Sequence, residues 1–307
     1  MSKLRIGLVG AAGRGGAFRA ALEDYGAEIA AVCDTDASKL HAAARDLRAP
    51  QQYRDYSEML DRCALDAVLI GTPQHLHAPQ CISALERGLH VLSEVPAAIS
   101  LDQSKSLAAA CAKNHGLYMM AENYVFTRQN ILLRELAARG LFGDVYYAEG
   151  EYLHDVRDLA ERTPWRRHWQ LGIDGITYPT HSLGPILQWM HGDRVARACC
   201  AGSGSHYVDR RGEPYHQDTA VMLCETERGA LIKIRTDLVS NRPHAMTNYQ
   251  LQGTRGAYES ARASTETDRI WLDELGPEAA WHDLRSVEES YLPQEWRNPP
   301  AAAVRAG

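Results

Sequence analysis

The sequence predicts an α/β domain with a parallel sheet, followed by an α+β domain with an open, mostly antiparallel sheet. Short, continuously apolar segments alternate with helical patterns as far as Asn123, which is typical of a parallel sheet buried on both faces. Beyond it, apolar and polar residues alternate along longer segments with hairpin spacing. The 307 residues are also enough for two domains, which we place at residues 1–123 and 124–307.

The elements of the first domain follow in a regular order. Apolar runs predict strands over residues 4–10, 27–34, 65–73, 89–96 and 117–123. Helical spacing after residue 10 and over residues 38–47, 77–88 and 101–116 predicts the helices between them. Each strand is thus joined to the next through a helix, as parallel neighbours require.

The turn after the first strand has the residues of a nucleotide-binding loop. It is a GxGxxG pattern with an alanine at the middle glycine: Gly10, Ala11, Ala12, Gly13, Arg14, Gly15. Gly10 permits the tight turn, Gly15 permits close packing of helix on strand, and the helix start presents N–H groups to a pyrophosphate. The methyl of Ala12 lies where the backbone nears the phosphates. We therefore expect a dinucleotide-binding Rossmann domain.

Asp34 closes the second strand and indicates which dinucleotide binds. A carboxylate here accepts hydrogen bonds from both adenine-ribose hydroxyls and repels a 2′-phosphate, so we expect NAD rather than NADP. The alternative is a glycine turn in an unrelated α/β domain, with Asp34 as a helix cap.

Composition excludes several classes of function. The net charge is -6 and no basic run occurs, so we expect no nucleic-acid partner. The apolar runs are too short to span a membrane, and a strand from Leu4 leaves no room for a signal peptide. The seven cysteines lack CxxC spacing, and most lie in apolar segments, as reduced core cysteines do. We expect a soluble cytoplasmic protein.

The second domain begins with a helix and continues mainly as strands. Amphipathic spacing predicts helices over Arg128–Gly143 and residues 181–192. Alternation predicts strands over residues 144–155, 195–203, 218–226, 229–238, 246–260 and 269–273.

The chain resembles a known family over nearly its whole length. The segments "GAAGRG", "AVCD", "TPQHLHAPQCISALERGLHVLSEVP", "LFGDV" and "QGTRGAYE" resemble the Gfo/Idh/MocA oxidoreductases. The resemblance implies a Rossmann domain, an open-faced antiparallel sheet and a sugar or cyclitol substrate. Those enzymes usually have Glu-Lys-Pro where this chain has Glu94, Val95 and Pro96, so the lysine that assists proton removal is absent.

Further segments narrow the resemblance to one branch. "EVPAA", "MMAENY", "GLFGDV", "YLHDVR" and "YPTHSLGP" are most similar to the NAD-dependent glycosidases, typified by bacterial α-N-acetylgalactosaminidases, which also lack the lysine. His181 matches the histidine of the dehydrogenase pattern, but Thr177 and Gly184 replace its two acids. The branch implies oxidation of the sugar 3-hydroxyl by NAD, removal of the C2 proton, loss of the C1 group, addition of water, and return of the hydride.

That chemistry needs groups that move protons. His181 is the leading candidate for the hydroxyl base, because imidazole titrates near neutral pH. Tyr152 aligns with the branch's active-site tyrosine, and Tyr178 lies three residues before His181. We expect catalysis by these three residues, although a helix-capping histidine and two packing tyrosines remain the alternatives.

Other residues of the resembling segments are candidates for binding the cofactor. We place Thr72, Pro73 and Glu94 at the cofactor, with Glu94 either contacting the nicotinamide ribose or only closing the strand. His77 follows in the same segment and can cap the helix after it, while Asn123 can hold the nicotinamide ribose.

The candidates for binding the substrate are His154, Arg157, Trp165 and Tyr291. His154 can orient the tyrosines, and Arg157 can bind a polar or acidic part of the substrate. The segment "WRRHW" from Trp165 is either a substrate-binding lip or a loop at a subunit contact. No HxxH or HExxH pattern occurs, so we expect no metal.

Three functions remain open from the sequence: an NAD-dependent glycosidase, an ordinary sugar or cyclitol dehydrogenase, and a non-catalytic NAD- or sugar-binding module. Similar sequences continue past "NPPAAAVRAG" with an "HGG.D" segment and a helix, so we expect this chain to lack that segment. We also expect a homo-oligomer through the open sheet face.

Overall fold

A computed structural model describes residues 3–243, 246–276 and 280–298. The chain divides into two compact units, which meet in the sequence between Ala121 and Glu122. Of the C-terminal segment "NPPAAAVRAG", only Asn298 lies within the described residues.

The first unit contains a six-stranded sheet in which every pair of neighbouring strands is parallel. Its strands, in spatial order, are β3 (Gln51–Tyr53), β2 (Glu28–Cys33), β1 (Arg5–Val9), β4 (Ala67–Ile70), β5 (His90–Ser93) and β6 (Tyr118–Met120). The order reverses direction between β1 and β4, which is the point where doubly wound sheets bind ligands at their carboxyl ends. The predicted parallel α/β fold is confirmed.

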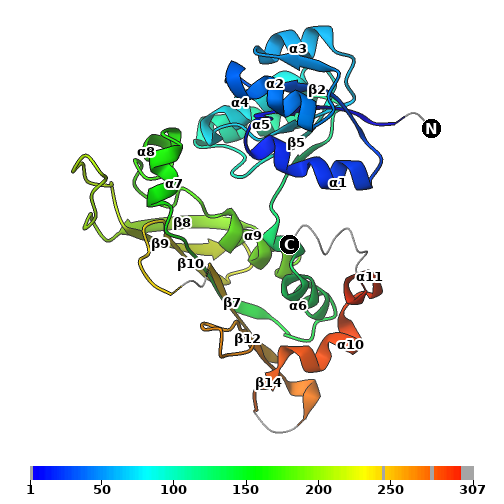
Figure 1. Ribbon diagram of the computed structural model, residues 1–307. Helices are drawn as coiled ribbons and strands as arrows, with labels where there is room; N and C mark the ends of the chain where they lie inside the picture. Colours follow the sequence, from blue (N-terminus) through cyan, green and yellow to red (C-terminus); the bar gives the residue numbers. More distant parts are fainter. Residues whose placement is uncertain (1–2, 244–245, 277–279, 299–307) are drawn as a thin grey trace. The chain divides into compact units, whose positions relative to one another are not determined.

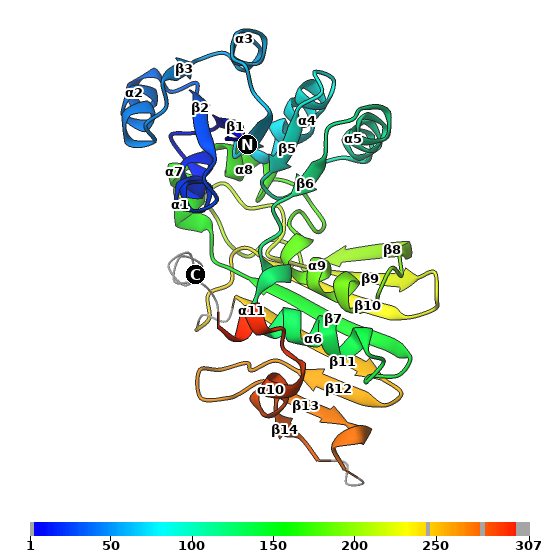
Figure 2. The same ribbon diagram turned by 90° about the vertical axis from the view of Figure 1, so that its right-hand side faces the viewer.

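Helices cover both faces of this sheet (Figure 2). On one side lie α1 (Arg19–Asp24) and α2 (Ala37–Asp46), and on the other lie α4 (His77–Leu85) and α5 (Leu101–Lys113). Strands β1, β2, β4 and β5 bury side chains in two separate clusters, one below each helical layer. An apolar groove of about 300 Å³ lies beside β4, β5 and β6, where Leu117 and Met119 are exposed.

The second unit contains an eight-stranded sheet that is mostly antiparallel, with β7 and β10 as a parallel pair. Its strands, in spatial order, are β14 (His282–Asp283), β13 (Arg269–Leu272), β12 (Gly256–Glu259), β11 (Thr247–Gly253), β7 (Val145–Leu153), β10 (Leu231–Asp237), β9 (Thr219–Thr226) and β8 (Val195–Gly202). This agrees with the predicted α+β domain.

Two helices lie over the same face of that sheet, α6 (Arg128–Ala138) and α9 (Thr180–Trp189) (Figures 1 and 2). They enclose the largest apolar core with β7, β10 and β11. Helix α9 approaches β7 closely because Gly150 has no side chain: a Cβ there would lie 2.6 Å from the Ser182 carbonyl oxygen. This close approach fixes where His181, in the first turn of α9, lies against the sheet.

Several short elements are not predicted by the sequence patterns. They include β3, α3 (Tyr56–Arg62), α7 (Arg157–Arg162), α8 (Trp165–Trp169), α10 (Glu288–Tyr291) and α11 (Gln294–Arg297). Helix α6 ends at Ala138 rather than at Gly143, because Gly140 adopts a φ of +73° that a helix does not allow.

Candidate active site

The glycine turn of the first unit has the geometry that a dinucleotide loop needs. Gly10 has a φ of +73°, and a Cβ there would lie 2.6 Å from the Gly71 carbonyl oxygen. A Cβ on Gly15 would lie 2.6 Å from the Val9 carbonyl oxygen. Only glycine fits either position. The N–H group of Gly13 donates to the Gly10 carbonyl over 3.1 Å, which closes the turn.

Asp34 lies beside this turn, as expected from its place after β2. One carboxylate oxygen accepts the N–H group of Ala12 at 2.9 Å, and the other accepts the N–H group of Asp36 at 3.0 Å. These bonds fix the carboxylate while leaving it lone pairs for ribose hydroxyls. The turn and the acid therefore fit NAD, and the charge of Asp34 opposes a 2′-phosphate.

The end of β5 is tied to the same turn. The Arg14 guanidinium donates to the Glu94 carboxylate at 2.5 Å, and Glu94 also accepts the Val95 N–H group at 3.2 Å. Val95 is 6% exposed, so the position where related dehydrogenases have a lysine carries a buried apolar side chain. Glu94 lies at the nucleotide-binding turn, and Val95 itself supplies no basic group in place of the lysine.

The remaining candidates of the first unit lie at the ends of β4 and β5. Thr72 donates its hydroxyl to Gln80 at 2.6 Å, and Pro73 precedes the short turn η2 (Gln74–Leu76). His77 begins α4, where it is 1% exposed and its ring nitrogens contact two backbone carbonyl groups. It is a buried bridge between loops, whereas the sequence suggested a capping residue.

In the second unit, His181 forms a buried pair with Glu122. The His181 Nδ1 atom lies 2.8 Å and 3.0 Å from the two carboxylate oxygens of Glu122, and the two side chains are 7% and 6% exposed. A carboxylate only accepts hydrogen bonds, so Nδ1 carries the proton and a neutral ring keeps its lone pair on Nε2. The pair has the arrangement of a general base held by a carboxylate.

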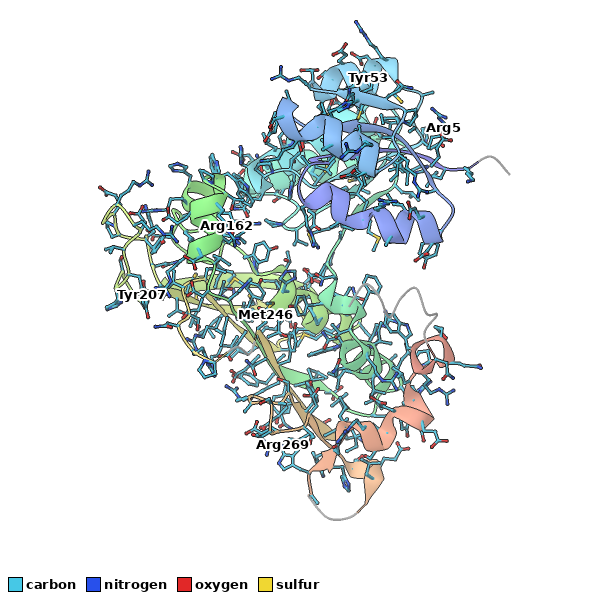
Figure 3. All side chains as sticks on the ribbon, in the orientation of Figure 1. Arg5, Tyr53, Arg162, Tyr207, Met246 and Arg269 are labelled. Atoms are coloured by element: carbon cyan, nitrogen blue, oxygen red, sulfur yellow. The ribbon has the colours of Figure 1, made fainter. Side chains whose placement is uncertain are left out.

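Three tyrosine rings surround the His181 imidazole. The ring of Tyr124 lies 4.5 Å from it, and those of Tyr152 and Tyr178 each lie 5.0 Å from it, measured between centroids. The Tyr124 hydroxyl donates to the sulfur of Met246 at 2.8 Å; Met246 is labelled in Figure 3. The structure thus brings together all three predicted catalytic residues, His181, Tyr152 and Tyr178, in one cluster.

The Tyr152 phenol is buried and stays in its protonated form. Burial raises its pKa above the ordinary range, so the hydroxyl is protonated at neutral pH. The hydroxyl lies 3.0 Å from Nδ1 of His154, whose backbone N–H group is held by the Asp237 carbonyl at 2.8 Å. This contact places His154 beside the Tyr152 hydroxyl, so the expected orienting role of His154 stays a prediction.

Glu122, the partner of His181, is not among the residues that the sequence indicated. It lies two residues after the end of β6, next to Asn123, so its place at the end of the strand predicted over residues 117–123 was the available signal. The structure also explains why Gly184 stands where related dehydrogenases have an acid. A Cβ at Gly184 would lie 3.1 Å from Cγ of Glu122. A side chain at position 184 would therefore press against Glu122.

The other predicted residues of the second unit lie outside the tyrosine and histidine cluster. Asn123 is exposed before the turn η3 (Tyr124–Phe126). Arg157 pairs with Asp155 at 2.5 Å, and its guanidinium lies 4.7 Å from the centroid of the Tyr207 ring, labelled in Figure 3. Tyr291, on α10, stacks with Arg139 at 5.2 Å and donates to Glu274 at 3.2 Å.

Trp165 and the rest of "WRRHW" form the short helix α8, where Arg166 stacks on the Trp165 ring at 4.3 Å. The next residue, Arg167, pairs with the carboxylate of Asp209 at 3.1 Å. Burial alone would raise the pKa of Asp209, but hydrogen bonds from the Glu213 and Arg211 backbone and from Arg167 lower it to about 2. This pair anchors α8 to the loop before β9.

Within the described ranges, no three His, Cys, Asp or Glu side chains are placed to hold a metal ion. No described helix is long and apolar enough to cross a membrane.

Two family models match the chain. Residues 4–122 match the oxidoreductase family, NAD-binding Rossmann fold, and residues 126–307 match the glycosyl hydrolase 109, C-terminal domain. The first unit is therefore an NAD-binding Rossmann domain.

Curated relatives and solved structures agree with these matches. A glycosyl hydrolase family 109 protein of Saccharopolyspora erythraea is 31% identical over 92% of this chain and 67% of its own length. An alpha-N-acetylgalactosaminidase of Shewanella oneidensis is 29% identical over 84% of this chain and 63% of its own length. An inositol dehydrogenase homologue from Azotobacter vinelandii, crystallised with NAD+, has the same fold, with a TM-score of 0.79 and 21% identity over 98% of this chain and 80% of that one.

Proposed function

Because the chain belongs to glycosyl hydrolase family 109 and carries an NAD-binding Rossmann domain, we propose that it is an NAD-dependent glycosidase that cleaves its substrate through transient oxidation of the sugar. The observation that carries this proposal is the buried pair of His181 and Glu122 at 2.8 Å, with Tyr152 beside it. This cluster supplies a base and an acid in a chain that has Val95 in place of the dehydrogenase lysine.

Bound NAD, held by the turn of Gly10 and Gly15 with Asp34, would supply the hydride acceptor for the sugar C3 and the hydride that later restores it. His181 accepts the proton of the 3-hydroxyl on Nε2, since Nδ1 is engaged by Glu122. Glu122 keeps the imidazole in this tautomer and stabilises the positive charge that the ring gains. Tyr152, protonated because burial raises its pKa, donates a proton to the departing group, while Tyr178 packs against both rings.

The substrate class follows from the relative named alpha-N-acetylgalactosaminidase. We propose an α-linked 2-acetamido sugar, whose C2 proton becomes acidic once C3 is a ketone. Removal of that proton and loss of the C1 group are then steps of proton transfer, which the histidine and tyrosine cluster can perform.

The experiment that tests this function counts products. The protein is incubated with NAD and p-nitrophenyl α-N-acetylgalactosaminide, and p-nitrophenol and NADH are measured over many turnovers. We expect p-nitrophenol to exceed the NAD present, with no net NADH. Accumulation of NADH in proportion to sugar oxidised, without cleavage, would instead identify a dehydrogenase.

We also propose that a second copy of the chain covers the sheet face opposite α6 and α9. On that face Lys233 and Glu149 pair at 2.7 Å between β10 and β7, and Leu223 and Leu231 are 40% and 42% exposed. Sedimentation of the wild type and of Leu223→Glu tests this, because a charge in the interface would dissociate the oligomer.

The seven free cysteines support a location in the reducing cytoplasm.

A further inference from the structure

The backbone carbonyl of His181 lacks the donor that a regular helix would give it. In an α-helix, the N–H group of each residue donates to the carbonyl group four residues earlier. The residue four positions after His181 in α9 is Pro185, which has no N–H group. The Tyr249 hydroxyl donates to the His181 carbonyl oxygen instead. A side chain of the sheet therefore makes the hydrogen bond that the helix itself cannot form.

We propose that Tyr249 positions the catalytic histidine: its hydroxyl replaces the missing helical donor, fixes the first turn of α9 and so holds Nε2 of His181 in place for the substrate. The inference rests on the proposed function, in which His181 is the base. Tyr249 acts on the backbone of His181, so it is a positioning residue.

The sheet presents Tyr249 at the point where α9 comes closest. On β11, Tyr249 lies directly opposite Gly150 of β7. Gly150 leaves room for the helix backbone, since a Cβ there would lie 2.6 Å from the Ser182 carbonyl oxygen. One cross-strand pair thus admits the helix through its glycine and binds the preceding carbonyl group, that of His181, through its tyrosine.

The Tyr249 side chain is itself held firmly. It is 6% exposed, and its ring packs edge-on against the Trp189 ring, with 5.5 Å between the centroids. Trp189 is the last residue of α9, and His181 is the second. Tyr249 therefore contacts the helix near both of its ends, which fixes how α9 lies along the sheet.

The environment keeps the Tyr249 hydroxyl in the form that donates. Burial raises the pKa of Tyr249, and the negative charge of Glu122 raises it further, so the phenol retains its proton. Glu122 also accepts the Nδ1 proton of His181. The histidine is thus held at two points, its ring by Glu122 and its backbone by Tyr249.

The first test removes the hydroxyl and keeps the ring. In Tyr249→Phe, the buried His181 carbonyl loses its donor and the first turn of α9 can shift. Because a small displacement of a catalytic group can cost up to about 100-fold in rate, we expect kcat to fall about 30-fold. The KM and the dissociation constant of NAD should stay within about twofold of wild type, since the change leaves ground-state binding intact. A wild-type kcat in Tyr249→Phe would overturn the proposal.

The second test gives the helix its own donor. Pro185→Ala supplies an N–H group four residues after His181, so the Tyr249 hydroxyl is no longer needed. In the Pro185→Ala background, Tyr249→Phe should therefore lower kcat by less than about threefold, against the larger loss in the wild-type background. An equal loss in both backgrounds would contradict the proposal, because it would show that the hydroxyl does not act through this carbonyl.

The matched control is Tyr258→Phe, which removes a buried tyrosine hydroxyl from the same core. Tyr258 is 1% exposed, and its hydroxyl donates to the Asp268 carboxylate at 2.9 Å. This change should lower the melting temperature and leave kcat at the wild-type value. A similar fall in kcat in both tyrosine variants would indicate general loosening of the core and would refute the specific role of Tyr249.

The last experiment needs neither substrate nor NAD. The ¹H NMR signal of the His181 Nδ1 proton is observed in the ligand-free protein and assigned by its loss in His181→Gln. We expect Tyr249→Phe to shift this signal and to speed its exchange with water by about tenfold, as the buried turn opens more often. Tyr258→Phe should have neither effect, and in the Pro185→Ala background Tyr249→Phe should have neither effect. An unchanged signal in Tyr249→Phe would overturn the inference. If the wild type shows this NMR behaviour but cleaves no glycoside, the proposed function fails and the positioning of His181 by Tyr249 stands.

Discussion

Replacing Glu122 with glutamine tests the catalytic pair most sharply. Glu122→Gln keeps the size of the side chain and removes its charge. The two carboxylate oxygens that now lie 2.8 Å and 3.0 Å from Nδ1 of His181 become one oxygen and one amide nitrogen. The amide nitrogen cannot accept the imidazole proton, so the ring is no longer restricted to the tautomer with a free Nε2.

The size of the effect follows from the burial of the pair. Both side chains are less than 8% exposed, so their hydrogen bond is poorly screened, and a bond to a charged group contributes about 1.5–3 kcal/mol. If that energy is realised when the ring gains a proton in the transition state, kcat/KM falls about 10- to 100-fold. The binding of NAD should not change, because Glu122 belongs to the second unit.

The assay is NAD-dependent release of p-nitrophenol from the α-N-acetylgalactosaminide, with NAD affinity and the melting temperature measured in parallel. Glu289→Gln, an equal change at an exposed position of α10, is the control and should behave as wild type. Activity of Glu122→Gln within twofold of wild type, with unchanged stability, would refute the role of the pair.

Four further predictions concern Tyr152, Gly184, Asp34 and Asp209. Tyr152→Phe should lower kcat about 100-fold or more without changing NAD affinity, as expected on loss of a proton donor; equal kcat values would exclude the phenol from the chemistry. Gly184→Ala should lower activity about tenfold, because its methyl would lie 3.1 Å from Cγ of Glu122; unchanged kinetics would show that the carboxylate has room to move. Asp34→Ser should weaken NAD binding about tenfold and bring NADP to similar affinity, measured by titration; retained preference for NAD would place the discrimination elsewhere. Asp209 has its pKa lowered from 3.8 to about 2 in the fold, so its stabilisation is present above pH 4 and lost as pH falls toward 2; unfolding curves of Asp209→Asn should lack that acid loss, and an unchanged acid limb would contradict the assignment.

The sequence patterns predicted the strands whose apolar residues form a continuous run or recur at every second position. The continuous apolar runs of β1, β2, β4 and β5 and the alternation along β7, β9 and β10 were read correctly, because burial on two faces or on one face leaves a distinct pattern. The short helices α7 and α8 lack enough turns to show helical spacing. They are held by tertiary contacts such as that of Arg167 with Asp209, which no local pattern records.

The site was predicted only in part, because local segments of the sequence indicate some of its residues but not the contacts between distant ones. His181, Tyr152 and Tyr178 were recognisable from segments that resemble a family, and the structure brings them together. Glu122 was not, since it is 59 residues from its partner His181 and its neighbour Asn123 was taken to be the functional residue of that segment. The contacts of the His77 ring with two backbone carbonyl groups were not predicted either, because those groups lie on loops after two different strands.

The central claim is that the sugar is cleaved through transient oxidation at C3. The most direct measurement is cleavage of the α-N-acetylgalactosaminide in D₂O, with mass spectrometry and NMR of the released sugar. The account predicts deuterium at C2 in the product, no net NADH, and no cleavage when NAD is omitted. Cleavage that proceeds without NAD and leaves the original hydrogen at C2 would contradict it.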